Sequence, residues 1–463
     1  MNPKFLKMNT LIAISGLGIL ILLAEIFNAR KAIVPLTIVG LLAILGYNIS
    51  PYNHFGTFYN NMIVVDKFSV AFSSLFIIIT IFLVALSHDF YKDHATKISD
   101  YVAIKIFLLA GAIAMVSFGN LSMFFLGIEV LSIALYILAA SNRLNLKSNE
   151  AGMKYFLMGS FASGIILFGI CLIYGAIGSF DLDVIYQITH TQSYPQWYFI
   201  GIVFLVIGML FKIATVPFHF WAPDVYEGAP ALTTATMSSL TKVVAMAALF
   251  KLVSALMPVQ TYSFQMIIVC VAIASMVLGN IMALRQNNVK RIIAFSGVSH
   301  AGFMVMTLLL VNNAASTLLY YASAYAIAGI AFFAVVLYVT KDKENETIDS
   351  FYGFGKTHPL LAGILTASLL SMAGIPILAG FFAKLFLLNQ LVQTGWMVLV
   401  IVAIVSSIIS VGYYFKIIVA MYTKENEIVL PKVPVIYQIV AVLAMIMNIV
   451  MGLFPNLILN LLN

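Results

Sequence analysis

The stretch Gly208-Met209-Leu210-Phe211-Lys212-Ile213-Ala214-Thr215-Val216-Pro217 combines an apolar helix, a charge and a proline. It ends an apolar run that begins near residue 197, and about 20 apolar residues are enough to cross roughly 30 Å of hydrocarbon. A lysine at mid-bilayer costs about 2.5–3.5 kcal/mol, so it usually faces a protein interior or a water path. Because proline removes a backbone donor, we expect a membrane helix that breaks just after Lys212.

The rest of the chain repeats this apolar pattern. The hydrophobic share is 62% and the charged share 9%, against about 45–50% and 25% in soluble domains, which excludes a water-soluble fold. We predict an all-α membrane protein with about fourteen transmembrane helices. Their predicted ranges are 8–27, 32–48, 66–88, 99–118, 121–140, 151–177, 197–217, 229–257, 263–284, 292–311, 314–340, 358–392, 395–422 and 432–455.

The basic residues indicate the orientation of these helices. Of the 24 Lys and Arg, we count 14 in connections after odd-numbered helices and 3 on the opposite side. The positive-inside rule then places the odd-numbered connections in the cytoplasm and both termini outside. The net charge of +7 does not indicate nucleic acid, because these residues form no patch with aromatic side chains.

A second predicted helix carries its own interruption. Gly374 and Gly380 with Pro376 between them precede Lys384 in the run 358–392. This helix lies five helices after the first broken one, and five is odd, so a repeat of helices 4–8 in helices 9–13 would be inverted in the membrane. On this mapping Lys242 corresponds to Lys416. The predicted units are residues 1–98, 99–257, 263–422 and 432–463.

Seven lysines fall within the predicted spans: Lys105, Lys154, Lys212, Lys242, Lys251, Lys384 and Lys416. Lys212, Lys242 and Lys384 lie deepest or beside helix-breaking sequence. The other four lie close enough to a helix end for their ammonium groups to reach the interface instead.

Glu129 is the one carboxylate deep within a span, and it needs a partner. Pairing with Lys212 would satisfy both charges, and moving the acid away would turn Lys212 into a proton donor. Lys242 and Lys384 could receive the proton through water, hydroxyl groups or the histidines His219 and His300. Each histidine is equally well explained as a hydrogen-bonded structural residue.

The sequence offers little for redox or metal chemistry. It shows no metal-ligand spacing, no Gly-x-Gly-x-x-Gly fingerprint and no haem pair. We therefore expect no cofactor and no metal on this chain, and no electron transfer by it.

Three stretches carry a family resemblance. Pro217-Phe218-His219-Phe220-Trp221-Ala222-Pro223-Asp224-Val225-Tyr226-Glu227-Gly228-Ala229-Pro230 resembles the signature of the antiporter-like subunits of respiratory complex I. Its Asp-Val-Tyr-Glu-Gly-Ala-Pro form is similar to subunit N of bacterial NADH-quinone oxidoreductase rather than to subunits L or M. The stretches 150–160 and 288–302 agree with this resemblance.

The resemblance implies a proton path and a place within a larger assembly. The family's charged residues fall on Glu129, Lys212, Lys242 and Lys384, with His219, His300, Lys154 and Lys416 as further relay candidates. The chain would be a translocase subunit in a large assembly, beside K- and M-type subunits. NADH, flavin, iron-sulfur clusters and quinone would bind to other subunits.

Two other functions remain open. A subunit of a multi-subunit sodium/proton antiporter would share the fold and the buried lysines, although the Val-Tyr-Glu-Gly-Ala-Pro stretch argues against it. A passive membrane scaffold would leave Glu129 and the central lysines unexplained.

Overall fold

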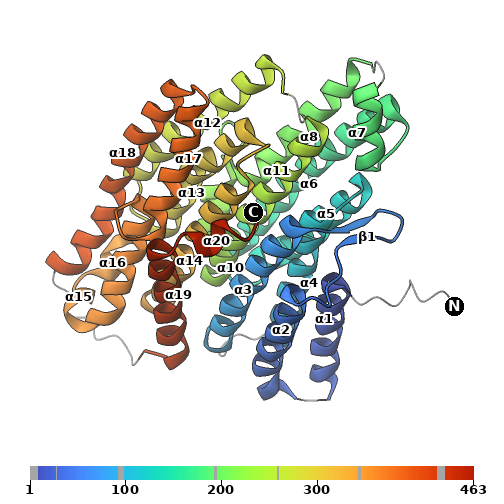
Figure 1. Cartoon of the computed structure of the whole chain (residues 1–463). Coiled ribbons are helices and arrows are strands. Elements are labelled where there is room, and N and C mark those ends of the chain that lie inside the picture. Colours follow the sequence, from blue (N-terminus) through green and yellow to red (C-terminus); the bar gives the residue numbers. More distant parts are fainter. Residues whose placement is uncertain are drawn as a thin grey trace.

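The computed structural model is almost entirely helical, with one short β-hairpin (Figure 1). It describes residues 9–27, 29–91, 98–191, 195–257, 260–341, 346–424 and 433–462. Both chain ends, residues 1–8 and 463, lie outside the described residues. The same holds for six of the basic residues that enter the orientation argument: Lys4, Lys7, Lys92, Lys97, Lys343 and Lys432.

Eleven helical segments in the described part of the chain are long and apolar enough to cross a membrane. They are η2 and α2 (Arg30–Ile49), α3 (Lys67–Phe90), α4 (Ile98–Ser117), α5 (Leu121–Ala139), α6 (Leu146–Ile177), α10 to α11 (Ala231–Leu256), α12 (Tyr262–Leu284), α13 and η4 (Val289–Leu310), α14 (Ala315–Val339), α18 (Met397–Thr423) and α19 (Val435–Leu453). Three shorter apolar helices fall on the remaining predicted spans: α1 (Thr10–Ile26), α8 (Trp197–Ile213) and α16 (Pro359–Ala373). The predicted membrane fold is confirmed.

The other elements include short connections between spans, the second half of the broken span (α17) and a short helix after the last span (α20). They are β1 (Gly56–Phe58), β2 (Ile63–Val65), α7 (Leu182–Thr191), α9 (Trp221–Gly228), η5 (Ile348–Phe351), α15 (Phe354–Thr357), α17 (Ala379–Gln393) and α20 (Asn456–Leu459). β1 and β2 pair antiparallel, and Ile63 also bridges to Phe118. The hairpin is thereby fixed to the end of α4.

Polar caps explain where several spans begin. Asp66 accepts a hydrogen bond from the Ser69 amide, and Asn120 and Asn288 cap α5 and α13 in the same way. These side chains satisfy amides that have no partner within the helix, so an apolar segment can start at a defined residue.

Helices α13 and α14 form the centre of the bundle (Figure 1). Their apolar windows are fully buried by protein, and α14 packs against α3, α16, α17 and α19. Outer helices such as α18 instead carry exposed side chains, among them Val398 and Ile408, which suits contact with lipid tails. Polar groups on α13 and α14 are therefore shielded from lipid.

Both predicted breaks are present. Helix α8 ends at Ile213, where Ala214 adopts a left-handed conformation with φ of 60°. Helix α16 ends at Ala373, and Gly374 follows with φ of 91°, a conformation that glycine tolerates best. Four spans lie between α8 and α16, so the two broken helices run in opposite directions.

A third interruption escaped sequence reasoning. Between α10 (Ala231–Thr236) and α11 (Lys242–Leu256), residues Met237–Thr241 form a π-helical turn. Such turns are rare and often lie at functional sites. Lys242 is the first residue after it.

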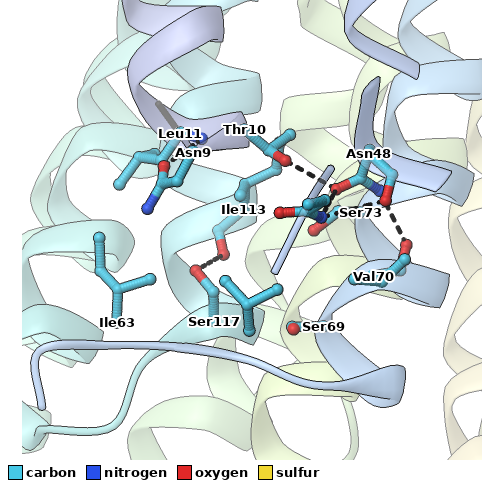
Figure 2. A pocket seen from close by; sticks show the side chains of 12 residues that line it. Asn9, Thr10, Leu11, Asn48, Ile63, Ser69, Val70, Ser73, Ile113 and Ser117 are labelled. Atoms are coloured by element: carbon cyan, nitrogen blue, oxygen red, sulfur yellow. Dashed lines mark hydrogen bonds between the residues drawn. The ribbon is translucent and has the colours of Figure 1, made fainter. Parts of the chain in front are cut away.

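Polar side chains that line a small pocket join the first helices (Figure 2). Asn48 accepts a hydrogen bond from Thr10 at 2.7 Å and donates to the Val70 carbonyl at 3.1 Å and to Ser74 at 2.9 Å. These bonds tie α1 and α2 to α3. In lipid, unsatisfied polar groups cost several kcal/mol, so this pocket fixes the position of the first two helices.

Candidate functional site

Lys242 lies at the centre of the protein. Its side chain is 1% exposed, and its ammonium has no hydrogen-bond partner in the described part of the chain. It faces the ring of Tyr226 on α9, 5.7 Å from the centroid. A side chain at Gly297 of α13 would overlap the Nζ atom, so the absence of a side chain there makes room for the lysine.

His300 lies one turn further along α13, among hydroxyl groups. Its Nδ1 is 2.8 Å from the Tyr321 hydroxyl, and its Nε2 is 3.3 Å from the Tyr414 hydroxyl. The Tyr325 ring lies 4.8 Å from the histidine ring. The Tyr325 hydroxyl lies 3.3 Å from Ser238 of the π-turn, and it would be 3.1 Å from a Cβ at Gly297. Tyr325 therefore lies beside both residues, with its ring next to His300 and its hydroxyl on the side of Gly297 where the Lys242 ammonium lies.

Lys384 of α17 completes this central cluster. Its ammonium donates at 2.8 Å to the Ala373 carbonyl, which the break after α16 leaves without a helical partner. The Phe303 ring lies 5.1 Å away. Lys384, His300 and Tyr325 share a cavity of about 10 Å³, close to the smallest space that holds one water molecule.

Lys212 and Glu129 lie near each other but form no ion pair within 4.0 Å. The Lys212 ammonium instead donates to Ser132 at 2.7 Å and lies 3.4 Å from the Tyr136 hydroxyl and from Ser163. Ser132, one turn after Glu129 on α5, lies next to the ammonium. The buried Oε1 of Glu129 has no hydrogen-bond partner in the described residues.

The other relay candidates lie outside the central cluster. His219 is buried in the turn after the α8 break, against Phe220, and its Nδ1 has no partner among the described residues. Lys154 bonds to Glu150 and Asp224 near the start of α6. Lys416 bonds to the Gln286 carbonyl and to Asn287 in a connection.

Of the lysines that the sequence left near the interface, Lys105 is buried and Lys251 is half-buried. Lys105 is 2% exposed and donates to Ser87 at 2.6 Å under the ring of Tyr91. Lys251 donates to the Val116 carbonyl at 2.7 Å. Their depth comes from helices that pack over them, which the local sequence does not record.

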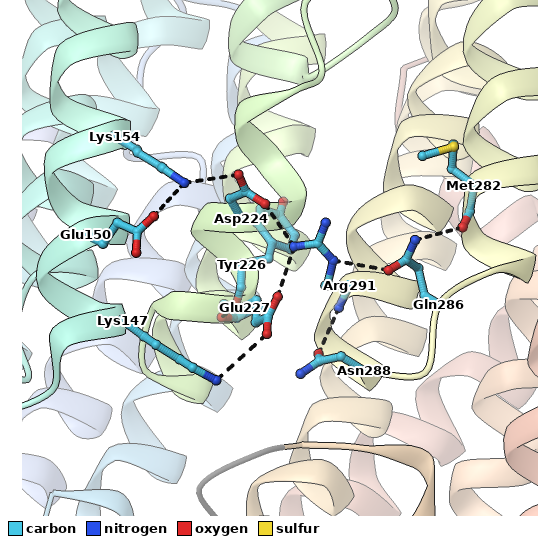
Figure 3. A network of polar contacts seen from close by, with 11 residues as sticks. Lys147, Glu150, Lys154, Asp224, Tyr226, Glu227, Met282, Gln286, Asn288 and Arg291 are labelled. Carbon is cyan, nitrogen blue, oxygen red and sulfur yellow. Dashed lines mark hydrogen bonds and ion pairs between the residues drawn. The ribbon is translucent and has the colours of Figure 1, made fainter.

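A network of ion pairs fixes α9 (Figure 3). Arg291 donates to Asp224 at 2.8 Å and to Glu227 at 2.9 Å, and Asp224 also pairs with Lys154 at 3.2 Å. The network joins α9 to α6 and α13, and α9 carries the Tyr226 ring that faces Lys242. Sequence reasoning assigned Lys154 to proton relay and did not see this network.

The network should also respond to pH. Burial alone would raise the pKa of the Asp224 carboxyl, but hydrogen bonds from Arg291 and Lys154 outweigh burial and hold its pKa below the usual value. A carboxyl with a lowered pKa contributes stability above its unfolded pKa and loses it as the pH falls through the folded one. We expect the network to persist at neutral and mildly acidic pH.

Asp224→Asn is expected to lower the stability of α9 by about 1 kcal/mol or less, because the pairs are partly exposed and screened by solvent. Thermal unfolding of the purified assembly measures the effect. The control is Glu150→Gln, which also removes an ion pair with Lys154. Glu150 is more exposed to solvent than Asp224. An equal shift in both variants would show that Arg291 adds nothing to the role of Asp224.

The described residues contain no group of three or more His, Cys, Asp and Glu that could hold a metal ion. The amines, hydroxyls and imidazole of the central cluster can donate and accept protons.

Residues 119–410, more than half of the chain, match the family described as NADH:quinone oxidoreductase/Mrp antiporter, TM. A relative from Flavobacterium psychrophilum, NADH-quinone oxidoreductase subunit N, is 82% identical over 98% of this chain and 100% of its own length. A chain in the structure of respiratory complex I from Thermus thermophilus with bound aureothin is 26% identical, with a TM-score of 0.84 over 97% of this chain and 98% of that chain. A chain of the Mrp complex from Dietzia sp. DQ12-45-1b, 20% identical, shares the fold with a TM-score of 0.85 over 100% of this chain and 96% of that chain.

The broken helices and buried lysines thus occur in a chain of the NADH:quinone oxidoreductase/Mrp antiporter class. Within that class the chain belongs to the family of NADH-quinone oxidoreductase subunit N. The resemblance seen in the sequence is confirmed, and the sodium/proton antiporter alternative is the less favoured one.

Proposed function

We propose that the chain is a proton-translocating membrane-arm subunit of an NADH-quinone oxidoreductase, and that protons pass between Lys242 and Lys384 by way of His300. The observation that carries this proposal is the convergence of these three groups around Tyr325. The chain would contribute to a translocase without carrying a redox centre itself.

The geometry supports each step. The Lys242 ammonium donates no hydrogen bond in the described part of the chain, so no partner must be lost before it releases a proton. Tyr325 lies between Lys242 and the His300 ring, and its hydroxyl can accept one proton while donating another. One water molecule in the cavity beside Lys384 would then join His300 to the lysine amine.

Lys212 and Glu129 are proposed to deliver protons to Lys242. The three hydroxyls around Lys212 can solvate its ammonium while the nearby carboxylate sets its affinity for the proton. His219, close to the α8 break, is proposed to link Lys212 with Lys242. Lys154 and Lys416, at helix ends, are proposed to exchange protons with the aqueous phases.

Glu129 also points to a partner subunit. It is half-buried on a face of α5 whose other residues, Leu126, Ile133 and Ile137, are exposed and apolar. A carboxylate on a lipid-facing surface is costly, so this face suits contact with protein. We propose K- and M-type membrane-arm subunits as neighbours, with NADH, flavin, iron-sulfur clusters and quinone on other subunits.

The placement in the membrane is part of the proposal. The bacterial relatives support a bacterial inner membrane, and the charge distribution supports an orientation with both termini in the periplasm. The opposite directions of α8 and α16 support the division into three first helices (1–98), inverted repeats at 99–257 and 263–422, and a last helix at 432–463.

Lys384→Arg is expected to leave assembly intact and to slow proton transfer, because arginine keeps the charge but does not give up its proton. Lys384→Glu should retain part of the activity, since a carboxyl group titrates and, when protonated, can donate to the Ala373 carbonyl. NADH-driven proton uptake by vesicles that contain the purified complex measures both variants. Full activity of the arginine variant would mean that Lys384 only anchors α17.

A further inference from the structure

Tyr414 of α18 reaches from the outer layer of the bundle to two residues of α13. Its side chain is fully buried, and its hydroxyl hydrogen-bonds to Ser296 and lies 3.3 Å from the Nε2 atom of His300. Ser296 and His300 are one helical turn apart on α13, so their side chains lie on the same face of that helix. The Tyr414 hydroxyl therefore links the two residues across the turn.

Hydrogen bonds from α12 hold this part of α18 in place. The Tyr413 hydroxyl donates to the Asn280 side chain of α12 at 3.1 Å, and Asn280 donates in turn to the Ser406 carbonyl of α18 at 2.8 Å. Asn280 is fully buried, and hydrogen bonds in such a low-dielectric place are stronger than hydrogen bonds in water. The neighbouring Tyr414 hydroxyl is thereby kept at α13.

His300 has a hydroxyl partner at each ring nitrogen. The Tyr321 hydroxyl of α14 lies 2.8 Å from Nδ1, and Tyr321 lines the small cavity beside Lys384. A neutral imidazole presents one donor and one acceptor, and a hydroxyl group can pair with either. A turn of the ring by about 180° would put carbon atoms in the places of the nitrogens and break both hydrogen bonds. The two hydroxyls therefore favour one orientation of the ring.

We propose that Tyr414 is a positioning residue for proton transfer through His300. By holding Nε2, it keeps Nδ1 beside Tyr321 and the cavity, so that the imidazole can pass a proton without first turning. Ser296 supports this role, because its hydroxyl gives the Tyr414 hydroxyl a second partner. The inference rests on the proposed function, since Tyr414 has this role only if His300 carries the proton.

The first test is Tyr414→Phe, which removes one oxygen atom and leaves the ring in place. The complex should assemble and lose NADH-driven proton uptake in vesicles by about tenfold, because the energy of one hydrogen bond can change a rate by that factor. The control is Tyr320→Phe on α14. Tyr320 is equally buried, but its hydroxyl donates to the Met451 carbonyl, so this variant should pump as the unchanged complex does. Equal uptake by the two variants would overturn the role of Tyr414.

The pH profile of uptake separates positioning from a merely structural role. Tyr414→Phe removes a hydrogen-bond partner from an imidazole, so the pH at which uptake is half-maximal should change. Tyr320→Phe removes a hydrogen bond to a backbone carbonyl and should leave that pH unchanged. An unchanged profile in Tyr414→Phe would mean that its lost uptake comes from weaker packing, which contradicts positioning.

Two further variants complete the test. Ser296→Ala combined with Tyr414→Phe should lower uptake no more than Tyr414→Phe alone, because Ser296 acts only through the Tyr414 hydroxyl. Effects that multiply would remove Ser296 from the arrangement. His300→Gln separates this inference from the proposed function: if that variant pumps fully, the route through His300 fails. If it loses uptake while Tyr414→Phe pumps fully, only the positioning role fails.

Discussion

A complex that carries Lys242→Met is expected to assemble normally and to lose proton uptake by about 10²-fold or more, the usual contribution of a positioned proton-transfer group. Methionine fills a similar volume but cannot carry a proton. Since Lys242 makes no hydrogen bond in the described residues, its replacement leaves no buried group without a partner. Removal of a buried charge should, if anything, stabilise the fold.

Two further variants make this result specific. Lys31→Met changes an exposed lysine in the connection before α2 and should pump as the unchanged complex does. Gly297→Ala keeps Lys242 but displaces its ammonium from the place beside Tyr325, so it should pump more slowly without losing assembly. Native gels, quinone reduction and proton uptake are measured together. Normal pumping by Lys242→Met would remove this lysine from the path.

Gly380→Ala is expected to prevent stable assembly. Gly380 is the second residue of α17, and a Cβ there would overlap the Ser371 carbonyl of α16. Because the opposing atom belongs to the backbone, the overlap can be relieved only by separating the two halves of the broken helix. Overpacking in cores usually costs about 1–3 kcal/mol, and we expect the upper end of that range here.

The matched control is Gly363→Ala, within α16. A Cβ at Gly363 meets no atom within 4 Å, and alanine favours the helix more than glycine does. The yield of assembled complex and its melting temperature should fall for Gly380→Ala and stay level or rise for Gly363→Ala. Equal behaviour of the two variants would mean that the contact between α16 and α17 is loose.

The sequence predicted the spans and both broken helices, because hydropathy, glycine and proline act locally. It could not separate Lys105 from Lys154, since both lie a few residues inside a span. In the structure Ser87 and Tyr91 of α3 cover Lys105, whereas Lys154 reaches carboxylates near a helix end. Burial depends on which helix packs alongside, and that information lies elsewhere in the chain.

In the site, too, some features could be predicted from the local sequence and others depend on how the helices pack. The charged site residues could be recognised in the sequence because a charge within a membrane is energetically costly. His219 and His300 could also be recognised as candidates. The pairing of Glu129 with Lys212 stays a prediction, and the structure adds Ser132, one turn after Glu129, as a hydrogen-bond acceptor for the ammonium. Tyr325, Tyr321 and Tyr414 were not anticipated, since tyrosine is common in apolar helices and only the packing of α13, α14 and α18 brings their hydroxyls to His300.

The π-turn at Met237–Thr241 has a consequence for how this helix can change over time. One additional residue in a helix rotates everything after it by about 100°. Deleting any single residue of this turn would restore a regular α-helix and swing Lys242 away from Gly297 and Tyr325 towards another neighbour. The segment should accept substitutions far more readily than changes in length, because a shift of one residue, harmless in most loops, would here separate Lys242 from Tyr325.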